Sequence, residues 1–173
     1  MEIYLIRHTT PDIPKGIIYG HLDIGVSNDF NQEANRIVSE LPENYDIVYS
    51  SPSLRCKLLS ERLFTTFQYD ERLMEINFGD WEGKNWDEIS LDELNPWMND
   101  YENIAPPNGE NLIQMRVRVI EFLDSIKNLN YQRVILVTHG GVIRIIKAIS
   151  EKKTIQEVMD EKLSFGAIYK LDW

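Results

Sequence analysis

Two histidines in the sequence each follow a short apolar run. His8 comes after Ile3–Ile6 and Arg7, and His139 comes after Val134–Thr138. Apolar runs of this length are typical of buried strands, and ligands of open α/β sheets bind outside the carboxyl ends of the strands. A single histidine in such a place is more often a structural residue, but two of them indicate a shared pocket. We therefore expect the two histidines to meet at one edge of a sheet.

Two arginines accompany these histidines. Arg7 adjoins the first one, and Arg55 lies one turn into a helix that is expected to start at Ser51-Pro52, after a strand over Asp46–Ser50. A guanidinium group pairs bidentately with phosphate oxygens, and a helix N-terminus attracts anions through its free N–H groups and its dipole. The pattern predicts a site for a phosphoryl group.

Imidazole is a competent nucleophile, so one histidine could attack phosphorus, and the departing oxygen would then need a proton. Glu75 is the best candidate for that acid because both of its neighbours are apolar, a setting in which a carboxyl group can hold a proton. The competing candidates are Asp80, Glu82 and Glu110. Of these, Glu82 follows an exposed turn and is expected to have a structural role.

The chain has 173 residues, a length typical of one domain over residues 1–173. Its 18 Lys and Arg residues against 28 Asp and Glu residues give a net charge of −10, which disfavours nucleic acids and anionic membranes as partners. The single cysteine, Cys56, excludes an internal disulfide and is expected to be buried and inert. The sequence shows neither the apolar run of a signal peptide nor one long enough to cross a bilayer, so a cytoplasmic location is expected.

Predicted strands and helices alternate along the chain. Strands are expected over Ile3–Ile6, Asp46–Ser50, Arg133–Thr138 and Phe165–Leu171, and helices over Asn28–Leu41 with Ser27 as N-cap, from Ser51-Pro52 to Phe67, from Asn111 to Leu129, and from Gly140 to Ile149. Tyr69–Gly83 is expected to be extended and looped, and Thr154–Glu157 resembles a capping box. This alternation predicts an α/β fold, a three-layer α/β/α sandwich with a mostly parallel central sheet.

The segment from Lys84 to Asn108 is acidic and aromatic, and is expected to form one or two short helices in a lid-like insertion over the pocket. Its acidic residues should repel substrates with several additional negative charges, and its aromatic residues either stack on a flat ring or pack onto the body. The acidic residues are Asp87, Glu88, Asp92, Glu93, Asp100 and Glu102, and the aromatic ones are Trp86, Trp97 and Tyr101.

Four blocks of the sequence resemble the histidine phosphatases of the phosphoglycerate mutase-like superfamily. They are Arg7-His8, the Ser-Ser-Pro-x-x-Arg segment Ser50–Arg55, the stretch Leu73–Gly83 and the stretch Val137–Arg144. A further match begins with Gly20-His-Leu-Asp23 and ends at Ser27, and another is Gly109-Glu110 with Arg116 downstream. The resemblance spans nearly the whole chain, with the blocks in the expected order.

The resemblance implies that His8 accepts the phosphoryl group as a phosphohistidine. It implies that Arg7, Arg55 and His139 clamp the phosphate, and that Glu75 donates a proton to the leaving group and then acts as base for water. Members of the family need no metal, and no other cofactor is expected.

The sequence departs from the family pattern beside the expected nucleophile. Thr9 stands where a glycine is common, Thr10 where an acidic residue is usual, and Pro14 where an asparagine is common. The loop is therefore expected to be built differently, with the hydroxyl of Thr9 or Thr10 in compensation. Further substrate contacts are expected from Gly140 and from His21, which is otherwise a loop residue.

Within the superfamily, the opening Arg7–Pro11, the stretch Tyr19–His21 and the block Leu73–Gly83 most resemble the α-ribazole phosphatases of cobalamin assembly. This implies hydrolysis of α-ribazole phosphate, a small phosphorylated metabolite. The alternatives are a phosphoglycerate mutase-type transfer, a broad-specificity phosphatase and a non-enzymatic phosphate-binding module. A metallohydrolase lacks the ligand spacing of known motifs, and a homodimer is left open.

Overall fold

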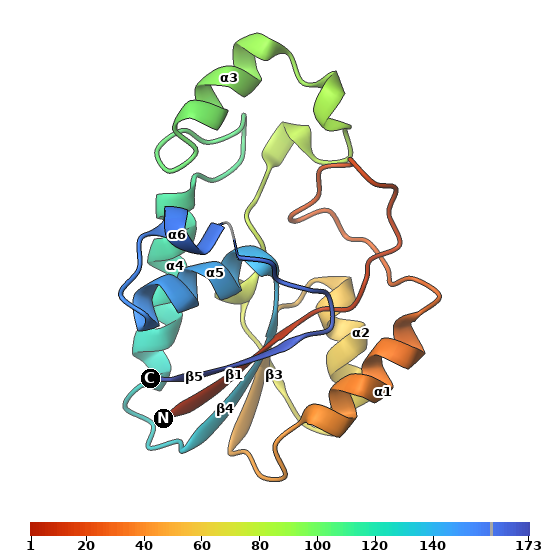
Figure 1. Cartoon of the computed structure of the whole chain (residues 1–173), viewed down its shortest axis with the longest axis vertical. Helices are drawn as coiled ribbons and strands as arrows, with labels where there is room; N and C mark the ends of the chain where they lie inside the picture. The colour runs from red at the N-terminus through yellow and green to blue at the C-terminus, as the bar shows by residue number, and fades with distance from the viewer. Residues whose placement is uncertain (160) are drawn as a thin grey trace.

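The central element of the computed structural model, which describes residues 1–159 and 161–173, is a five-stranded sheet (Figure 1). Its strands are β1 (Glu2–Arg7), β2 (Ile47–Ser50), β3 (Gln68–Tyr69), β4 (Arg133–Thr138) and β5 (Ile168–Asp172), in the order β3-β2-β4-β1-β5. β5 runs antiparallel to β1, and the other neighbouring strands are parallel. The mostly parallel sheet predicted from the sequence is confirmed.

The register between β1 and β4 brings the two histidines together. Ile3 pairs with Val134, and the pairing continues to Arg7 and Thr138. The next residue of each strand is therefore a histidine, and both leave the sheet at the same carboxyl edge. The backbone N–H of His8 donates to the carbonyl of Thr138 across 3.0 Å, which extends the ladder one residue further.

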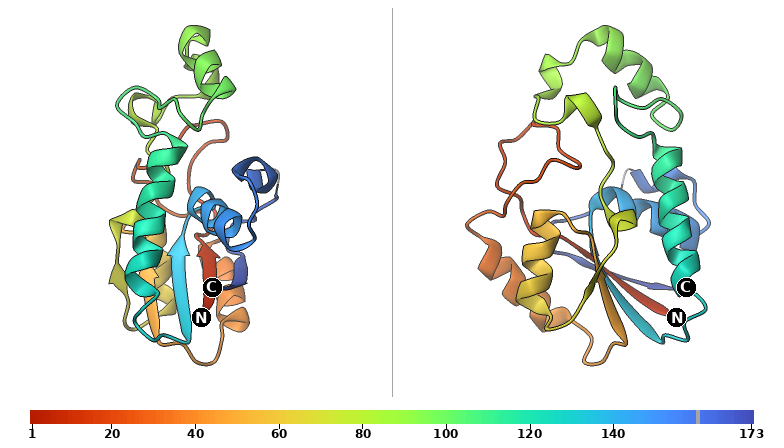
Figure 2. Two further views of the ribbon diagram at one scale, coloured as in Figure 1. Left: turned by 90° about the vertical axis from the view of Figure 1, so that its left-hand side faces the viewer. Right: turned by 180° about the vertical axis from the view of Figure 1, so that it is seen from behind.

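Helices cover both faces of the sheet (Figures 1 and 2). They are α1 (Phe30–Glu40) and α2 (Leu54–Leu63) on one face, and α4 (Leu112–Ile126) and α5 (Gly140–Ser150) on the other, with α6 (Ile155–Met159) beside α5. Side chains alternate along β4: Val134 and Leu136 join the apolar cluster of α4 and α5, whereas Ile135 and Val137 join that of α1 and α2. This alternation produces the predicted three-layer sandwich.

Some predicted boundaries were wrong. Helix α2 begins at Leu54 after Ser53, not at Ser51-Pro52, because the backbone of Ser51 still donates to the carbonyl of Val137. The helix also ends at Leu63, which leaves room for the unpredicted strand β3 beside β2. Helix α1 begins at Phe30 with Asp29 as N-cap residue, rather than Ser27. By contrast, the capping box predicted at Thr154–Glu157 is confirmed.

The insertion lies beyond the carboxyl edge of the sheet, and the arrowheads of β1 and β4 point toward it (Figure 2, left). The insertion contains the short helices η3 (Trp86–Glu88) and α3 (Leu91–Asn99), and it follows η1 (Glu71–Leu73) and η2 (Gly79–Trp81). Backbone contacts hold η2 against the far end of the insertion. Asp80 donates to the carbonyl of Pro107, and Gly79, with a φ of 54°, approaches Pro107 so closely that a β-carbon would lie 2.1 Å from its oxygen.

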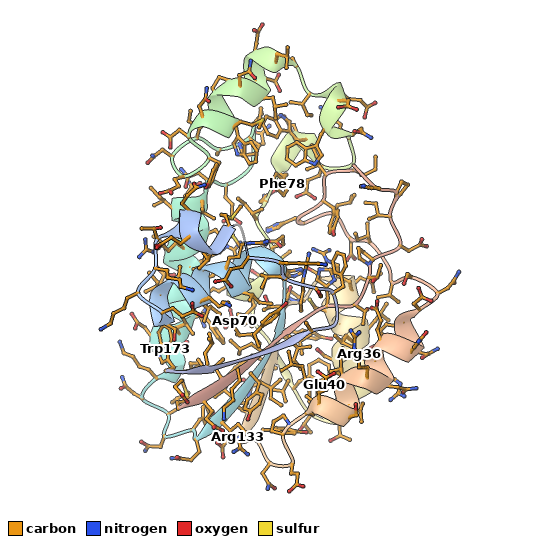
Figure 3. The ribbon with its side chains drawn as sticks, in the orientation of Figure 1. Arg36, Glu40, Asp70, Phe78, Arg133 and Trp173 are labelled. Atoms are coloured by element: carbon orange, nitrogen blue, oxygen red, sulfur yellow. The ribbon has the colours of Figure 1, made fainter. Side chains whose placement is uncertain are left out.

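The aromatic residues of this part pack on one another. Ile18, Trp81 and Ile89 are buried beneath Phe78, Trp86 and Trp97. Phe78, labelled in Figure 3, lies between the insertion and the body. Across the described part of the chain, no helix combines the length and the apolar character needed to span a membrane.

Candidate active site

The two strand-end histidines lie side by side. The ring centroids of His8 and His139 are 5.1 Å apart, and both side chains are buried. The sequence predicted that they would share a pocket; the structure brings the two rings into contact, but only His8 is among the described residues that line the cavity.

The ring of His8 is oriented by its own backbone. Nδ1 lies 2.7 Å from the carbonyl oxygen of Thr9, and because a carbonyl can only accept, Nδ1 carries the proton. Burial lowers the pKa of His8 well below its ordinary value, and the positive charges of Arg55 and Arg7 add to this effect. The imidazole is therefore neutral, with a lone pair on Nε2. A neutral imidazole with a free Nε2 can act as a nucleophile.

His139 is held from both sides. A guanidinium nitrogen of Arg55, Nη2, lies 3.1 Å from Nδ1, and the Ser51 hydroxyl lies 2.8 Å from Nε2. Because the guanidinium can only donate, Nδ1 accepts and Nε2 donates to Ser51. Burial, Arg55 and His8 together lower the pKa of His139 well below its ordinary value. The sequence does not indicate a role for Ser51 at the histidine, and its place in the Ser-Ser-Pro block is the only signal of one.

In the described part of the chain, the guanidinium groups next to the histidines are not ion-paired with a carboxylate. Arg55 donates to the carbonyls of Gly20 and Leu22, and Arg7 donates to that of Leu163. Among the described residues, the Nε atoms of Arg7 and Arg55 are buried without a hydrogen-bond partner, and neither arginine forms a salt bridge. Buried, unpartnered cationic donors favour an anionic ligand.

Glu75 faces the same cavity as His8. Its Oε2 accepts from the backbone N–H of Gly141 at 3.1 Å, and its Oε1 accepts from that of Ile76 at 3.0 Å. The cavity, about 270 Å³, is lined by Arg7, His8, Tyr19, Glu75, Ile76, Phe78, Trp97, Tyr101, Leu112, Met115, Gly141, Arg144 and Met159.

The competing acids have other partners. Glu82 accepts backbone N–H groups from the loop at His21 and from Phe78, so it has the structural role expected of it. Asp80 accepts from Asn108, and Glu110 forms a salt bridge with Arg118. Within the part of the chain that the structure describes, Glu75 is the one carboxylate that lines the cavity.

Three further residues were predicted to contact the substrate: Thr10, His21 and Gly140. None of them is among the described residues that line the cavity. Thr10 gives both its backbone N–H and its hydroxyl to Glu33, whereas the Thr9 hydroxyl is buried without a partner in the described residues. His21 lines a separate groove. Gly140 packs against two guanidinium groups, since a β-carbon there would lie 3.2 Å from Arg144 Nη1 and 3.4 Å from Arg7.

The insertion contributes aromatic rather than acidic residues to the cavity. Trp97 and Tyr101 line it, whereas Trp86 packs against Phe78 and Trp81. None of the six acidic side chains of the insertion named above is among the described lining residues, so any repulsion of charged substrates by them acts from outside the cavity wall.

Three other observations complete the site. Arg144 lines the cavity with its Nε buried and unpartnered in residues 1–159 and 161–173. The sequence does not indicate a role for Arg144, although this residue ends the Val137–Arg144 block.

Burial raises the pKa of Cys56 to about 12, which agrees with the inert thiol expected from the sequence. The described residues contain no group of three or more His, Cys, Asp or Glu side chains that could hold a metal ion.

Comparison with known proteins places this geometry in context. The model of the histidine phosphatase superfamily (branch 1) matches residues 3–173. The chain is 33% identical over 154 residues to a Hydrogenobacter thermophilus protein named "Putative phosphoserine phosphatase 2", covering 84% of this chain and 76% of that protein.

Two further similar proteins are named as α-ribazole phosphatases. The chain is 28% identical over 160 residues to the adenosylcobalamin/α-ribazole phosphatase of Escherichia coli K12, covering 86% of this chain and 78% of the relative. The solved structure of the Shigella flexneri α-ribazole phosphatase superposes with a TM-score of 0.90 at 22% identity, covering 99% of this chain and 90% of the other. The latter similarity shows the shared fold.

Proposed function

Because this chain belongs to the histidine phosphatase superfamily, branch 1, we propose that it hydrolyses phosphomonoesters through a phosphohistidine at His8. One observation carries the proposal: the neutral ring of His8 and the carboxyl of Glu75 line one cavity, beside guanidinium groups without a carboxylate partner in the described residues. A site that only bound phosphate would need neither a nucleophile nor an acid.

In the first half-reaction, the guanidinium groups of Arg7 and Arg55 hold the phosphoryl oxygens, and His139 joins them by turning its Nε2–H from the Ser51 hydroxyl to the phosphate. Nε2 of His8 attacks phosphorus, the N–P bond forms, and the ester P–O bond breaks. Protonated Glu75 gives its proton to the departing oxygen, so the leaving group departs as an alcohol. The Thr9 carbonyl, 2.7 Å from Nδ1, stabilises the positive charge that develops on the imidazole.

In the second half-reaction, the Glu75 carboxylate takes a proton from water, and the water oxygen attacks phosphorus. The N–P bond breaks, inorganic phosphate leaves, and His8 returns to its neutral form. The guanidinium groups supply the positive charge that a metal ion supplies in other phosphatases, so turnover continues in excess chelator.

The test of this function is the intermediate itself. Substrate labelled in its phosphoryl group, quenched within the first turnover, should leave acid-labile, base-stable label on the wild-type protein but none on His8→Ala, which should also lose turnover. Full activity of His8→Ala would exclude the proposal. Release of inorganic phosphate, rather than transfer to a second hydroxyl, separates hydrolysis from a mutase reaction.

The substrate we propose is α-ribazole phosphate, whose leaving group carries a flat aromatic base. The aromatic walls of the cavity, Tyr19, Phe78, Trp97 and Tyr101, support a ring-bearing leaving group. The indole N–H of Trp97 is buried without a partner in the described residues and could donate to an acceptor on that group. The name of the Escherichia coli relative points the same way.

A second candidate is a phosphomonoester with a carboxylate, such as phosphoserine. Arg144 favours it, because this guanidinium lines the cavity with an unpartnered Nε and contacts only the carbonyl of Glu161 among the hydrogen bonds of the described residues. The name of the Hydrogenobacter relative is consistent with it. Comparing kcat/KM for O-phospho-L-serine and α-ribazole phosphate decides between them, and Arg144→Met should lower only the former if the carboxylate is the ligand.

A further inference from the structure

The segment that carries Glu75 lies outside the sheet, so its backbone carbonyls need other donors. Four consecutive carbonyls, those of Arg72 to Glu75, each accept a hydrogen bond from a side chain. Thr138, at the end of β4, donates to the carbonyl of Leu73 at 2.7 Å, and Arg118 of α4 donates to the other three.

Arg118 uses its whole guanidinium group for this contact. A guanidinium has five N–H donors, and in Arg118 five hydrogen bonds are formed. Nη1 donates to the carbonyls of Arg72 and Met74 at 2.8 and 2.7 Å, and Nη2 donates to that of Glu75 at 3.0 Å. The remaining two go to the carboxylate of Glu110, from Nε at 3.1 Å and from Nη2 at 2.5 Å.

Glu110 holds the other end of the same segment. Its Oε1 accepts from the backbone N–H of Asn77 at 3.0 Å, and its own backbone N–H donates to the carbonyl of Asn77 at 2.9 Å. The side chains of Arg118 and Glu110 are only 18% and 16% exposed, so water does not readily replace these contacts. The pair thus fixes the backbone on both sides of Glu75 without lining the cavity that holds its carboxyl.

We propose that Arg118 and Glu110 are positioning residues, which place the Glu75 carboxyl for proton transfer to the leaving group. The proposal rests on the proposed function and deepens it. Near-attack geometry is sensitive to small displacements, and a shift of about 1 Å in a catalytic group costs about 10²-fold in rate. A lysine at 118 keeps the charge, but its three donors radiate from one point and cannot span three carbonyls and a carboxylate.

The test compares leaving groups. An alkyl phosphate needs a proton on the departing oxygen, whereas p-nitrophenolate leaves as a stable anion. In Arg118→Lys and Glu110→Gln, kcat/KM for the alkyl phosphate should fall about 10²-fold, as it would for a misplaced acid. For p-nitrophenyl phosphate the fall should stay below about threefold, because general acid catalysis contributes little there. An equal fall with both substrates would overturn the proposal.

The matched control is Arg116→Lys, an exposed arginine two residues earlier on the same helix, which should leave both values unchanged. A double-mutant cycle adds a second readout. If Arg118 acts through Glu75, then adding Arg118→Lys to Glu75→Gln should cost no further activity on the alkyl phosphate. Additive losses would exclude action through Glu75, and a fall in melting temperature alone, with the leaving-group ratio unchanged, would assign the pair to stability.

The two proposals fail in distinguishable ways. If the proposed function is wrong, His8→Ala turns over normally and the wild-type protein forms no acid-labile phosphoprotein. If the positioning role is wrong, the wild-type protein forms the phosphohistidine, yet Arg118→Lys and Glu110→Gln keep the wild-type ratio between the two substrates.

Discussion

The backbone N–H of Gly141 donates to Glu75 Oε2 across 3.1 Å, and a β-carbon on Gly141 would lie 2.2 Å from Glu75 Oε1. The proposed acid is therefore docked against the first turn of α5, the helix that starts directly after His139. The absence of a side chain at residue 141 lets the carboxyl approach this backbone. The position of the acid is thus coupled to the strand end that carries the second histidine.

Replacing Gly141 by alanine should displace the Glu75 carboxyl. Since the added carbon would overlap the carboxylate, kcat/KM for an alkyl phosphate should fall about 10²-fold, with a smaller loss for p-nitrophenyl phosphate. The matched control is Gly25→Ala, where, apart from its two chain neighbours, no described residue lies within 4 Å of the added carbon. Wild-type kinetics in Gly141→Ala would show that Glu75 does not act from the position observed.

Removing a phosphate-holding side chain should weaken binding and slow chemistry together. In Arg55→Ala and in His139→Ala we expect kcat to fall by about 10²–10³, the usual cost of losing one donor to a developing charge. Inhibition by inorganic phosphate should weaken in parallel. Arg62→Ala, an exposed arginine of the same helix α2, serves as the control. A loss below about threefold in Arg55→Ala or His139→Ala would place that residue outside the phosphate site.

The two tryptophans of the insertion should behave differently. Trp97 lines the cavity, whereas Trp86 packs behind it against Phe78 and Trp81. We therefore expect Trp97→Ala to lower the ratio of kcat/KM for α-ribazole phosphate to that for 3-phosphoglycerate, and Trp86→Ala to leave it near the wild-type value. If both substitutions leave the ratio untouched, or if 3-phosphoglycerate is the better wild-type substrate, the aromatic walls do not select the leaving group.

Stability should decrease as the pH falls below neutrality. The pKa values of His8 and His139 are both lowered in the folded protein, chiefly by burial, so the unfolded chain binds protons first as the pH drops through about 6.5. Each histidine contributes a slope of up to about 1.4 kcal/mol per pH unit below that point. Urea unfolding at pH 7.0, 6.0 and 5.0 measures the free energy of unfolding and therefore this slope.

The control for this prediction is the double variant His8→Asn/His139→Asn, in which the dependence between pH 7 and 5 should flatten. Carboxylates with lowered pKa values, such as Asp70 and Glu157, act at lower pH because their ordinary values lie at 3.8 and 4.5. A free energy of unfolding that stays constant from pH 7 to 5 in the wild-type protein would contradict the neutral, buried state of the histidines.

By itself, the sequence determined four of the five strands, the mostly parallel character of the sheet and the meeting of the two histidines. Continuous apolar runs become buried strands because their side chains must leave water on both faces, and this constraint is local to each run. Parallel strands place their carboxyl ends at one edge, so residues that follow two such strands converge. Arg7 and Thr138 pair in the ladder for this reason, and His8 and His139 follow them.

Only the tertiary structure decided what surrounds these residues. The sequence favoured Glu75 over Glu82 as the acid, but it did not indicate that Ser51 contacts His139 or that Arg118 binds the carbonyls of Arg72, Met74 and Glu75. Such contacts join segments that lie far apart in the sequence. Glu75 is held by Gly141, 66 residues further along the chain, and no local pattern encodes that contact. Packing of α4 and α5 onto the sheet sets these contacts, because each buried polar group must find a partner in the folded chain.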